Sequence, residues 1–549
     1  MRRRFVVLAH SSVVILFLIG LVARLQGLTT TSGLFRDDAW VIAPVRAPGA
    51  IATRLTWTFP GFAYLERSIA AISPTSTLLA QALPFLAGIA ALPVLWWMIR
   101  QVIDQPRHAL AIATIVALSP IALTYSTRAK PYAVELLLGA VLLVMAEHTR
   151  QRPTTRNLVQ FIASSIVATF ISFAVLPVLV GGWVAVGWST PKGRGDQTRV
   201  LSAMAAAGVG AGLIVLAFFH GTPPSLHTFW EPFYVSYDSP QAFLRSLEHI
   251  VGGISHGLFG TALLQANHPL ASLVSLMVIV LLIGLARRFA RSGGEVALAP
   301  LATVGAAFAL AALRIVPLGT GRTDEVLYPA IALIIAGGLA TPVALRRGCV
   351  TGVAGGAVGL WSLIIVILSF TTNAPQYPTM AWNAVVAPIA AARVMPTPSK
   401  DTAPAPETTA FVIDAPLRYD WAIDPGGLAA PEFHITNATE PGYTVNVSTG
   451  TEGLFVAPAD PGDATYLPQR WATQLTAASA GPWQRSAIVF FGITEQVVNP
   501  TTGPLGSGAR VIHRSPLYTA LLADGWVGER TFFKPGVFAQ VLVRSNGPR

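Results

Sequence analysis

The sequence has 549 residues, of which 53% are hydrophobic and 11% charged, with a mean hydropathy of +0.57 and a net charge of +11. A soluble globular protein of this length needs more polar surface, so the composition excludes one. The positive charge lies mainly in short loops between apolar runs, so we expect no nucleic-acid partner and predict an integral protein of a lipid bilayer.

Apolar runs long enough to form membrane helices recur along the first two thirds of the chain. The first is interpreted as a retained span rather than a signal peptide, because the run is long and no clear cleavage site follows it. Residues 158–188 are either two tilted helices or one broken helix, because each half is short and Pro177 lies between them. The predicted spans are eleven: 5–27, 77–99, 109–126, 132–147, 158–174, 176–188, 200–219, 269–286, 296–313, 326–345 and 350–370.

Alternate loops between these runs are basic, which sets the predicted orientation by the positive-inside rule. With the N-terminus in the cytoplasm, an odd number of spans places residues 371–549 outside a plasma membrane. The basic residues assigned to the cytoplasm are Arg2–Arg4, Arg100, Arg107, Arg150, Arg152, Arg156, Lys192, Arg194, Arg199, Arg287, Arg288, Arg291, Arg346 and Arg347.

The last third of the chain has a different composition. Residues 371–409 are rich in Pro, Thr and Ala, which is typical of a linker between a membrane domain at 1–370 and a separate domain at 410–549. Short β-like runs at 410–415, 452–458, 486–493 and 538–545 and a helical stretch ending at Gly525 predict a small extracytoplasmic α/β domain. We expect this domain to bind an acceptor.

Four polar segments fall on the predicted extracytoplasmic face, where charged groups close to lipid tend to mark function. They are FRDDAW with Asp37 and Asp38, STRAKPY at 126–132, the loop 220–268, and PLGTGRTDEVLY at 317–328. An adjacent acid pair that merely faces water at a helix end is the plainer interpretation. Acids and bases gathered on one face instead favour attack by a hydroxyl group on a lipid-linked sugar. That reaction needs a carboxylate to accept the proton and a cation to meet the leaving phosphate.

The sequence resembles the GT-C glycosyltransferases, a superfamily that includes protein O-mannosyltransferases, the lipid A aminoarabinose transferase and cell-wall arabinosyltransferases. FRDDAW is similar to the acidic motif of their first extracytoplasmic loop. The stretch 56–92, with its Pro-aromatic helix, the element LSPIALTYSTRAKPYAVELLL and the element PLGTGRTDEVLYPAIALIIAGGL follow in the family's order. The resemblance covers residues 10–345 and implies the GT-C fold.

The resemblance also implies a role for each matching residue. Asp37 is the expected catalytic base, and Asp38 orients it or joins it in binding a divalent cation such as Mg²⁺, Mn²⁺ or Ca²⁺. The cations Arg322, Lys130 and Arg128 are expected at the donor phosphate, and Tyr132 and Glu135 at the donor pocket. The sequence departs from the family pattern where Arg128 replaces an acid and where a loop histidine is absent, which leaves metal dependence and sugar identity open.

The leading hypothesis is an inverting membrane glycosyltransferase. It would move a sugar from a polyprenyl phosphate to a glycan, lipoglycan or protein of the cell envelope, with mannose favoured and arabinofuranose next. The alternatives are a transporter or flippase of lipid-linked glycans, or a non-catalytic envelope-assembly protein. Some assignments also have plainer interpretations: Arg322 would only tie its loop to Asp324 or Glu325, Tyr132 would be an interfacial aromatic, and Trp230 would be ordinary loop packing.

Overall fold

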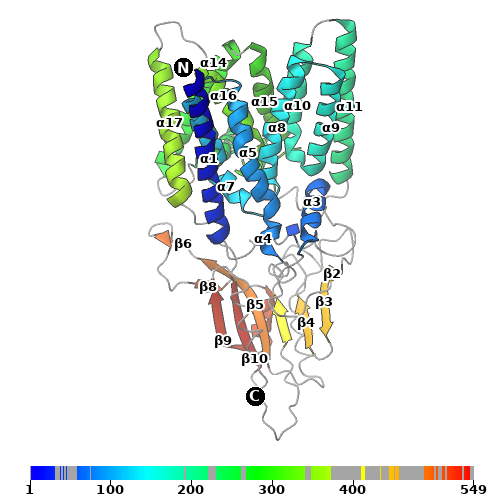
Figure 1. Ribbon diagram of the computed structural model, residues 1–549. Helices are drawn as coiled ribbons and strands as arrows, with labels where there is room; N and C mark the ends of the chain where they lie inside the picture. Colours follow the sequence, from blue (N-terminus) through cyan, green and yellow to red (C-terminus); the bar gives the residue numbers. More distant parts are fainter. Residues whose placement is uncertain are drawn as a thin grey trace. The chain divides into compact units, whose positions relative to one another are not determined.

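A computed structural model shows a bundle of helices and a set of β-strands (Figure 1). The chain divides into two compact units, one of residues 1–30, 57–65 and 81–373 and one of residues 31–56, 66–80 and 374–549. The structure describes residues 2–30, 38, 41, 42, 45, 59–73, 76–190, 193–219, 230–260, 268–292, 294–340, 348–371, 410–413, 433–434, 444–449, 452–456, 487–496, 498–499, 503–504, 510–512, 516–534 and 537–544.

A helix overlaps each of the eleven apolar runs that the sequence singles out (Figure 1). The helices are α1 (Arg2–Thr30), α5 (Ala82–Arg100), the pair α6 (Pro106–Ala117) and α7 (Pro120–Ser126), α8 (Tyr132–Gln151), α9 (Thr155–Ile171), α10 (Leu176–Ser189), α11 (Arg194–Phe219), α14 (His268–Ser292), α15 (Leu298–Ala312), α16 (Tyr328–Ala340) and α17 (Gly348–Thr371).

Length and composition qualify some of these helices as membrane spans. Within the described residues, four are long and apolar enough to cross a bilayer: α5, α8, most of α11, and the stretch Gly294–Ala312 that contains α15. The pair α6 and α7 would be a fifth span, bent by 58°. Five further apolar helices are shorter, so eleven spans stay a prediction.

Two breaks in the helices have local causes. Pro120 begins α7, and proline disfavours helical geometry in the preceding residue, so α6 ends and Ser119 caps α7 by accepting from the Ala122 N–H at 3.2 Å. Ser172 is extended and caps the 3₁₀ turn Phe173–Val175, accepting from the Ala174 N–H at 3.2 Å. The stretch 158–188 is therefore two helices, which resolves the alternative left open by the sequence.

Close helix packing depends on small residues, as is common between membrane helices. A methyl group built on Gly181 of α10 would lie 2.4 Å from the backbone nitrogen of Thr303 in α15. One built on Gly139 of α8 would lie 2.5 Å from the Val326 carbonyl oxygen. These contacts bring α10 against α15, and α8 against the segment that precedes α16.

Among the described residues before 373, two α-helices lie outside the eleven runs, and a short third one forms the start of the run 77–99. The amphipathic helix α3 (Pro60–Ala70) fits the Pro-aromatic helix expected in the first loop, and Tyr64 stacks on Phe170 with ring centroids 6.3 Å apart. The short α4 (Thr77–Ala80) precedes α5, so α5 begins at Ala82 rather than at residue 77. Helix α13 (Pro240–Phe259) lies in the loop 220–268, where no helix was predicted.

The strands of the second unit form a mixed sheet in the order β2-β3-β4-β1-β5-β10-β9, with β8 paired to β5. Strand β1 is parallel to both β4 and β5, and β10 is antiparallel to β5 and β9. Their bounds are β1 Ala410–Ile413, β2 Phe433–His434, β3 Thr444–Thr449, β4 Glu452–Val456, β5 Ala487–Gln496, β6 Val498–Asn499, β7 Gly503–Pro504, β8 Arg510–Ile512, β9 Trp526–Lys534 and β10 Val537–Arg544.

Each of the four β-like runs of the sequence contains a strand, and helix α21 (Pro516–Ala523) occupies the expected helical stretch. The residue after its last turn, Gly525, has φ +92°, the left-handed geometry that glycine adopts at no steric cost. The second compact unit takes in residues 31–56 and 66–80 besides 374–549, and the predicted domain bounds 1–370, 371–409 and 410–549 stay a prediction. The predicted linker at 371–409 lies almost wholly outside the described residues.

Candidate functional site

The turn between α7 and α8 holds two buried cations. The Lys130 N–H donates to the Arg128 carbonyl at 2.8 Å, which folds the chain sharply before Pro131 and the start of α8. Arg128 is 3% exposed and Lys130 is 8% exposed. Buried cations are costly unless they meet opposite charge or hydrogen-bond acceptors, so this turn is suited to an anionic group.

The loop 317–327 is held by one carboxylate. Asp324 accepts hydrogen bonds from the N–H groups of Gly319 and Gly321, both at 2.8 Å. The two glycines have φ +83° and +74°, the left-handed region that residues with a side chain rarely adopt. Burial raises the pKa of Asp324 to about 6, against the opposing effect of these N–H bonds. The group is therefore mostly ionised at pH 7 and accepts from both donors.

A threonine pair completes the same loop. The Thr320 hydroxyl accepts from the N–H groups of Arg322 at 3.1 Å and Thr323 at 2.8 Å. The Thr323 hydroxyl donates to the Pro317 carbonyl at 3.1 Å. Thr320 and Thr323 thus each supply side-chain hydrogen bonds within the loop.

The guanidinium of Arg322 lies over an aromatic ring, with its central carbon 5.2 Å from the centre of the Trp230 ring. A cation over an indole face is held electrostatically. Trp230 is 8% exposed and packs edge-on against Phe233 at 5.8 Å. Asp324 accepts from the loop N–H groups of Gly319 and Gly321, and the two interpretations of Arg322, a phosphate contact or a tie within its loop, both stay predictions.

Helix α13 packs its glycines against this loop. A methyl group built on Gly253 would lie 1.8 Å from the Gly319 carbonyl oxygen, and one built on Gly319 would lie 2.4 Å from the Ile250 Cα atom. A methyl group on Gly257 would lie 2.2 Å from the Tyr328 hydroxyl oxygen. The backbone of α13 therefore contacts the backbone of the loop 317–327. The position of α13 thus fixes the position of the loop that carries Arg322.

The helical unit also contains a cluster of buried polar side chains, one of which, Glu325, belongs to the loop 317–327. The Ser172 hydroxyl donates to Glu135 at 2.5 Å, and Glu325 interacts electrostatically with Glu135, Arg24 and Asp324. Arg24 of α1 donates to the Ala117 carbonyl at 2.9 Å and to the Gly20 carbonyl at 3.2 Å. Charged groups buried within a membrane bundle are expensive and are retained mainly where they serve function.

The structure brings some of the expected site residues together. The ring of Tyr132 packs edge-on against Tyr125 at 4.6 Å, and Tyr125 interacts electrostatically with Tyr328 at the end of the 317–328 segment. Helix α8 also packs against that segment, where Gly139 meets the Val326 carbonyl. Arg322, Lys130, Arg128, Tyr132 and Glu135 therefore all belong to the helical unit.

The two aspartates of the first loop belong to the second unit. Asp38 is buried and has helical geometry, and Asp37 lies outside the described residues. Within the described residues, no three or more His, Cys, Asp or Glu side chains gather as metal ligands. The expected divalent cation would rest on Asp37 and Asp38 and stays a proposal.

Sequence reasoning missed four residues of this site. Trp230 was expected to be ordinary packing, and Ser172 and Tyr328 gave no signal of their own. Arg24 did give one, because a single arginine near the end of an apolar run is a recognisable intramembrane charge. The close approach of α13 could not be read from its glycines, since Gly252 beside them contacts nothing within 4 Å.

Comparison with known proteins supports the architecture through structure alone. No protein-family model and no curated protein matches the sequence. A crystal structure of ArnT from Cupriavidus metallidurans bound to undecaprenyl phosphate matches with a TM-score of 0.51 and 13% sequence identity. The match covers 96% of this chain and 97% of that one.

The chain has the fold of ArnT. The predicted fold class is confirmed in its coarser part, a largely helical protein with several apolar helices and an ArnT-like fold. At 13% identity the likeness concerns the fold, and it assigns no role to any residue of this chain.

Proposed function

We propose that this protein is a membrane glycosyltransferase that moves a sugar from a polyprenyl phosphate to an acceptor of the cell envelope. The observation that carries the proposal is the setting of Arg322. It is an arginine held over Trp230, on a loop whose own hydrogen bonds are satisfied by Asp324 and Thr320. A guanidinium beside an aromatic ring on such a loop is suited to bind phosphate oxygens.

The chemistry of the ligand follows from the charges. Arg322, Lys130 and Arg128 come from two loops of one unit, and arginine offers parallel donors that suit phosphate oxygens. Tyr125 and Tyr132 add aromatic surface on either side of the α7–α8 turn, which carries Arg128 and Lys130. The ArnT structure with the same fold is bound to undecaprenyl phosphate, which supports a polyprenyl phosphate as the ligand here.

The proposed reaction is a single displacement. A hydroxyl oxygen of the acceptor attacks the anomeric carbon of the sugar, and the bond from that carbon to the phosphate oxygen breaks. Asp37 accepts the hydroxyl proton, Asp38 orients Asp37 or helps to hold a divalent cation, and Arg322 and Lys130 stabilise the charge on the departing phosphate. Attack opposite to the leaving group inverts the anomeric centre.

Fine specificity extends the same proposal. Mannose is favoured as the sugar and arabinofuranose next, with a glycan, lipoglycan or protein as acceptor. The reaction is placed on the extracytoplasmic face of the plasma membrane, with a cytoplasmic N-terminus and an outer C-terminal domain. These assignments rest on the resemblance of the motifs and on the basic loops.

The test is to measure donor affinity and thermal stability together on variants of Arg322. Arg322→Ala should weaken binding of a polyprenyl-phosphate sugar by about 10–100-fold, the value of one or two hydrogen bonds to a charged group. Arg322→Lys should restore part of it, because a point charge replaces the fork. The control is Arg245→Ala, which removes an exposed arginine from α13. Unchanged donor affinity in folded Arg322→Ala would remove this residue from the phosphate site.

A further inference from the structure

A cavity of about 460 Å³ opens at the other end of the helical unit, among the ends of helices that carry the basic loops. It lies between the last turns of α5 and α8, the first turns of α9 and α15, and parts of α14 and α16. The Arg322 loop and the α7–α8 turn contribute none of its lining residues. It is therefore separate from the proposed donor site.

The cavity has an apolar floor and a polar rim. Met98, Leu143, Phe289 and Leu333 line the floor and are each less than 10% exposed. The rim is formed by polar side chains that are exposed or half-buried: Gln101, Glu147, His148, Gln151 and Gln160. Such a lining fits an amphipathic molecule, with its apolar part inside and its polar part at the opening.

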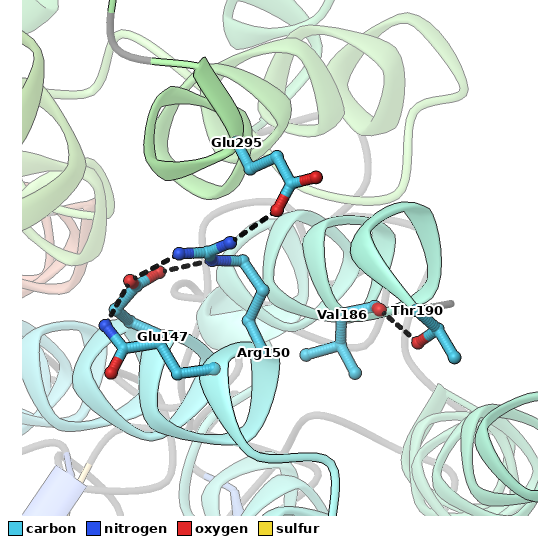
Figure 2. A network of polar contacts seen from close by, with 6 residues as sticks. Glu147, Arg150, Val186, Thr190 and Glu295 are labelled. Carbon is cyan, nitrogen blue, oxygen red and sulfur yellow. Dashed lines mark hydrogen bonds and ion pairs between the residues drawn. The ribbon is translucent and has the colours of Figure 1, made fainter. Parts of the chain in front are cut away.

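Glu147 of the rim belongs to a network of charged and polar side chains (Figure 2). The Arg150 guanidinium donates to Glu147 at 2.7 and 2.8 Å and to Glu295 at 2.8 Å. The Gln151 amide donates to the same Glu147 carboxylate at 2.7 Å. Two carboxylates thus share one arginine, so this network of three charged groups is net negative.

Gln101 and Gln160 add amide groups at the rim, and an amide both donates and accepts hydrogen bonds. Hydroxyl groups have the same double capacity, so sugar-like hydroxyls suit this rim better than a phosphate does. At about 30 Å³ per water-sized group, the cavity holds about fifteen such groups, which is the size of one acyl chain with part of a headgroup.

We propose that this cavity binds a membrane lipid with an uncharged, hydroxyl-rich headgroup, one chain of which fills the apolar floor. Helices α5 and α8, whose last turns line the cavity, are long and apolar enough to cross a bilayer, so the cavity belongs to a membrane-embedded part of the protein. The site would couple the enzyme to neutral glycolipids of its membrane, and it extends beyond the proposed donor chemistry.

The experiment uses the full-length protein in nanodiscs with two photoreactive lipids, each with a diazirine in its acyl chain. One is a glucosyl diacylglycerol and the other is phosphatidylglycerol, and cross-linked peptides are mapped by mass spectrometry. The glucolipid should label the peptides around Met98 and Leu143 about fivefold more than phosphatidylglycerol does, which is the value of one hydrogen bond. Equal labelling, or stronger labelling by the anionic lipid, would overturn the proposal.

Two variants test the lipid site, one in the wall of the cavity and one at its rim. Val144→Trp fills the cavity from its wall and should lower glucolipid labelling about tenfold. Its control Val180→Trp adds the same ring on the exposed face of α10, outside the cavity, and should not. Gln160→Leu changes only an exposed rim residue and should abolish the preference for the glucolipid. If Val144→Trp fails to fold, Gln160→Leu decides: a preference that survives that change contradicts the proposal.

Discussion

A methyl group added at Gly253 would test whether helix α13 positions the Arg322 loop. In Gly253→Ala the new methyl carbon would lie 1.8 Å from the Gly319 carbonyl oxygen, whereas ordinary contact begins at 3.4 Å. Helix and loop must therefore separate by about 1.6 Å. Because Asp324 bonds to both Gly319 and Gly321, the loop should move as one piece and carry Arg322 with it.

The expected effects differ in size between stability and activity. Forcing one methyl group into a packed contact typically costs about 1–3 kcal/mol of stability. Displacing a positioning group by about 1 Å costs on the order of 10²-fold in rate. We therefore expect Gly253→Ala to remain folded, with a lowered melting temperature and turnover reduced by about 100-fold.

The neighbouring glycine provides a matched control. A methyl group built on Gly252 meets nothing within 4 Å, and alanine is favoured over glycine in a helix by about 1 kcal/mol. Gly252→Ala should keep full donor affinity and turnover and melt slightly higher. Melting temperature, binding of a polyprenyl-phosphate sugar and release of polyprenyl phosphate should be measured on both variants. Wild-type turnover in Gly253→Ala would refute the positioning argument.

Three further predictions concern topology, the second unit and the acids. A cysteine placed at Ser399 should react with an impermeant thiol reagent in intact cells and one at Gly193 should not; labelling at Gly193 would reverse the orientation. Removing residues 410–549 should leave donor affinity unchanged, because the cations proposed for the phosphate site lie in the helical unit, but should raise the acceptor concentration that transfer requires; lost affinity in a folded, inserted protein would misplace the donor site. Asp37→Asn should bind donor normally and lower turnover by about 10²–10⁴-fold, and normal turnover would remove Asp37 as the base.

The helices were predictable because hydropathy is a local property of the sequence. Each apolar run contains a helix, and the bend between α6 and α7 follows from Pro120. Helix α13 was missed although its end signals are present: Ser239 caps its first turn, Pro240 begins it, and Gly260 ends it with φ +65°. An amphipathic helix in a long loop carries no apolar run, so a search for spans passes over it.

The candidate site was predictable in its charges and not in its contacts. The sequence singled out Arg322 and Lys130 from their motifs, but the cation–π contact with Trp230 joins two loops that are distant along the chain. The bond from Asp324 to the glycine N–H groups is local, and an acid shortly after two glycines is a turn signal that points to it.

The central claim is tested most directly by incubating the purified protein in nanodiscs with labelled mannosyl and arabinofuranosyl polyprenyl phosphates. The measured quantity is the polyprenyl phosphate released in the presence of envelope acceptors. We predict release from one of the two donors by the wild type, together with transfer of its sugar, and release reduced by at least about tenfold in Arg322→Ala. A folded wild-type protein that binds or translocates these lipids without breaking the sugar–phosphate bond would contradict the account and favour a transporter.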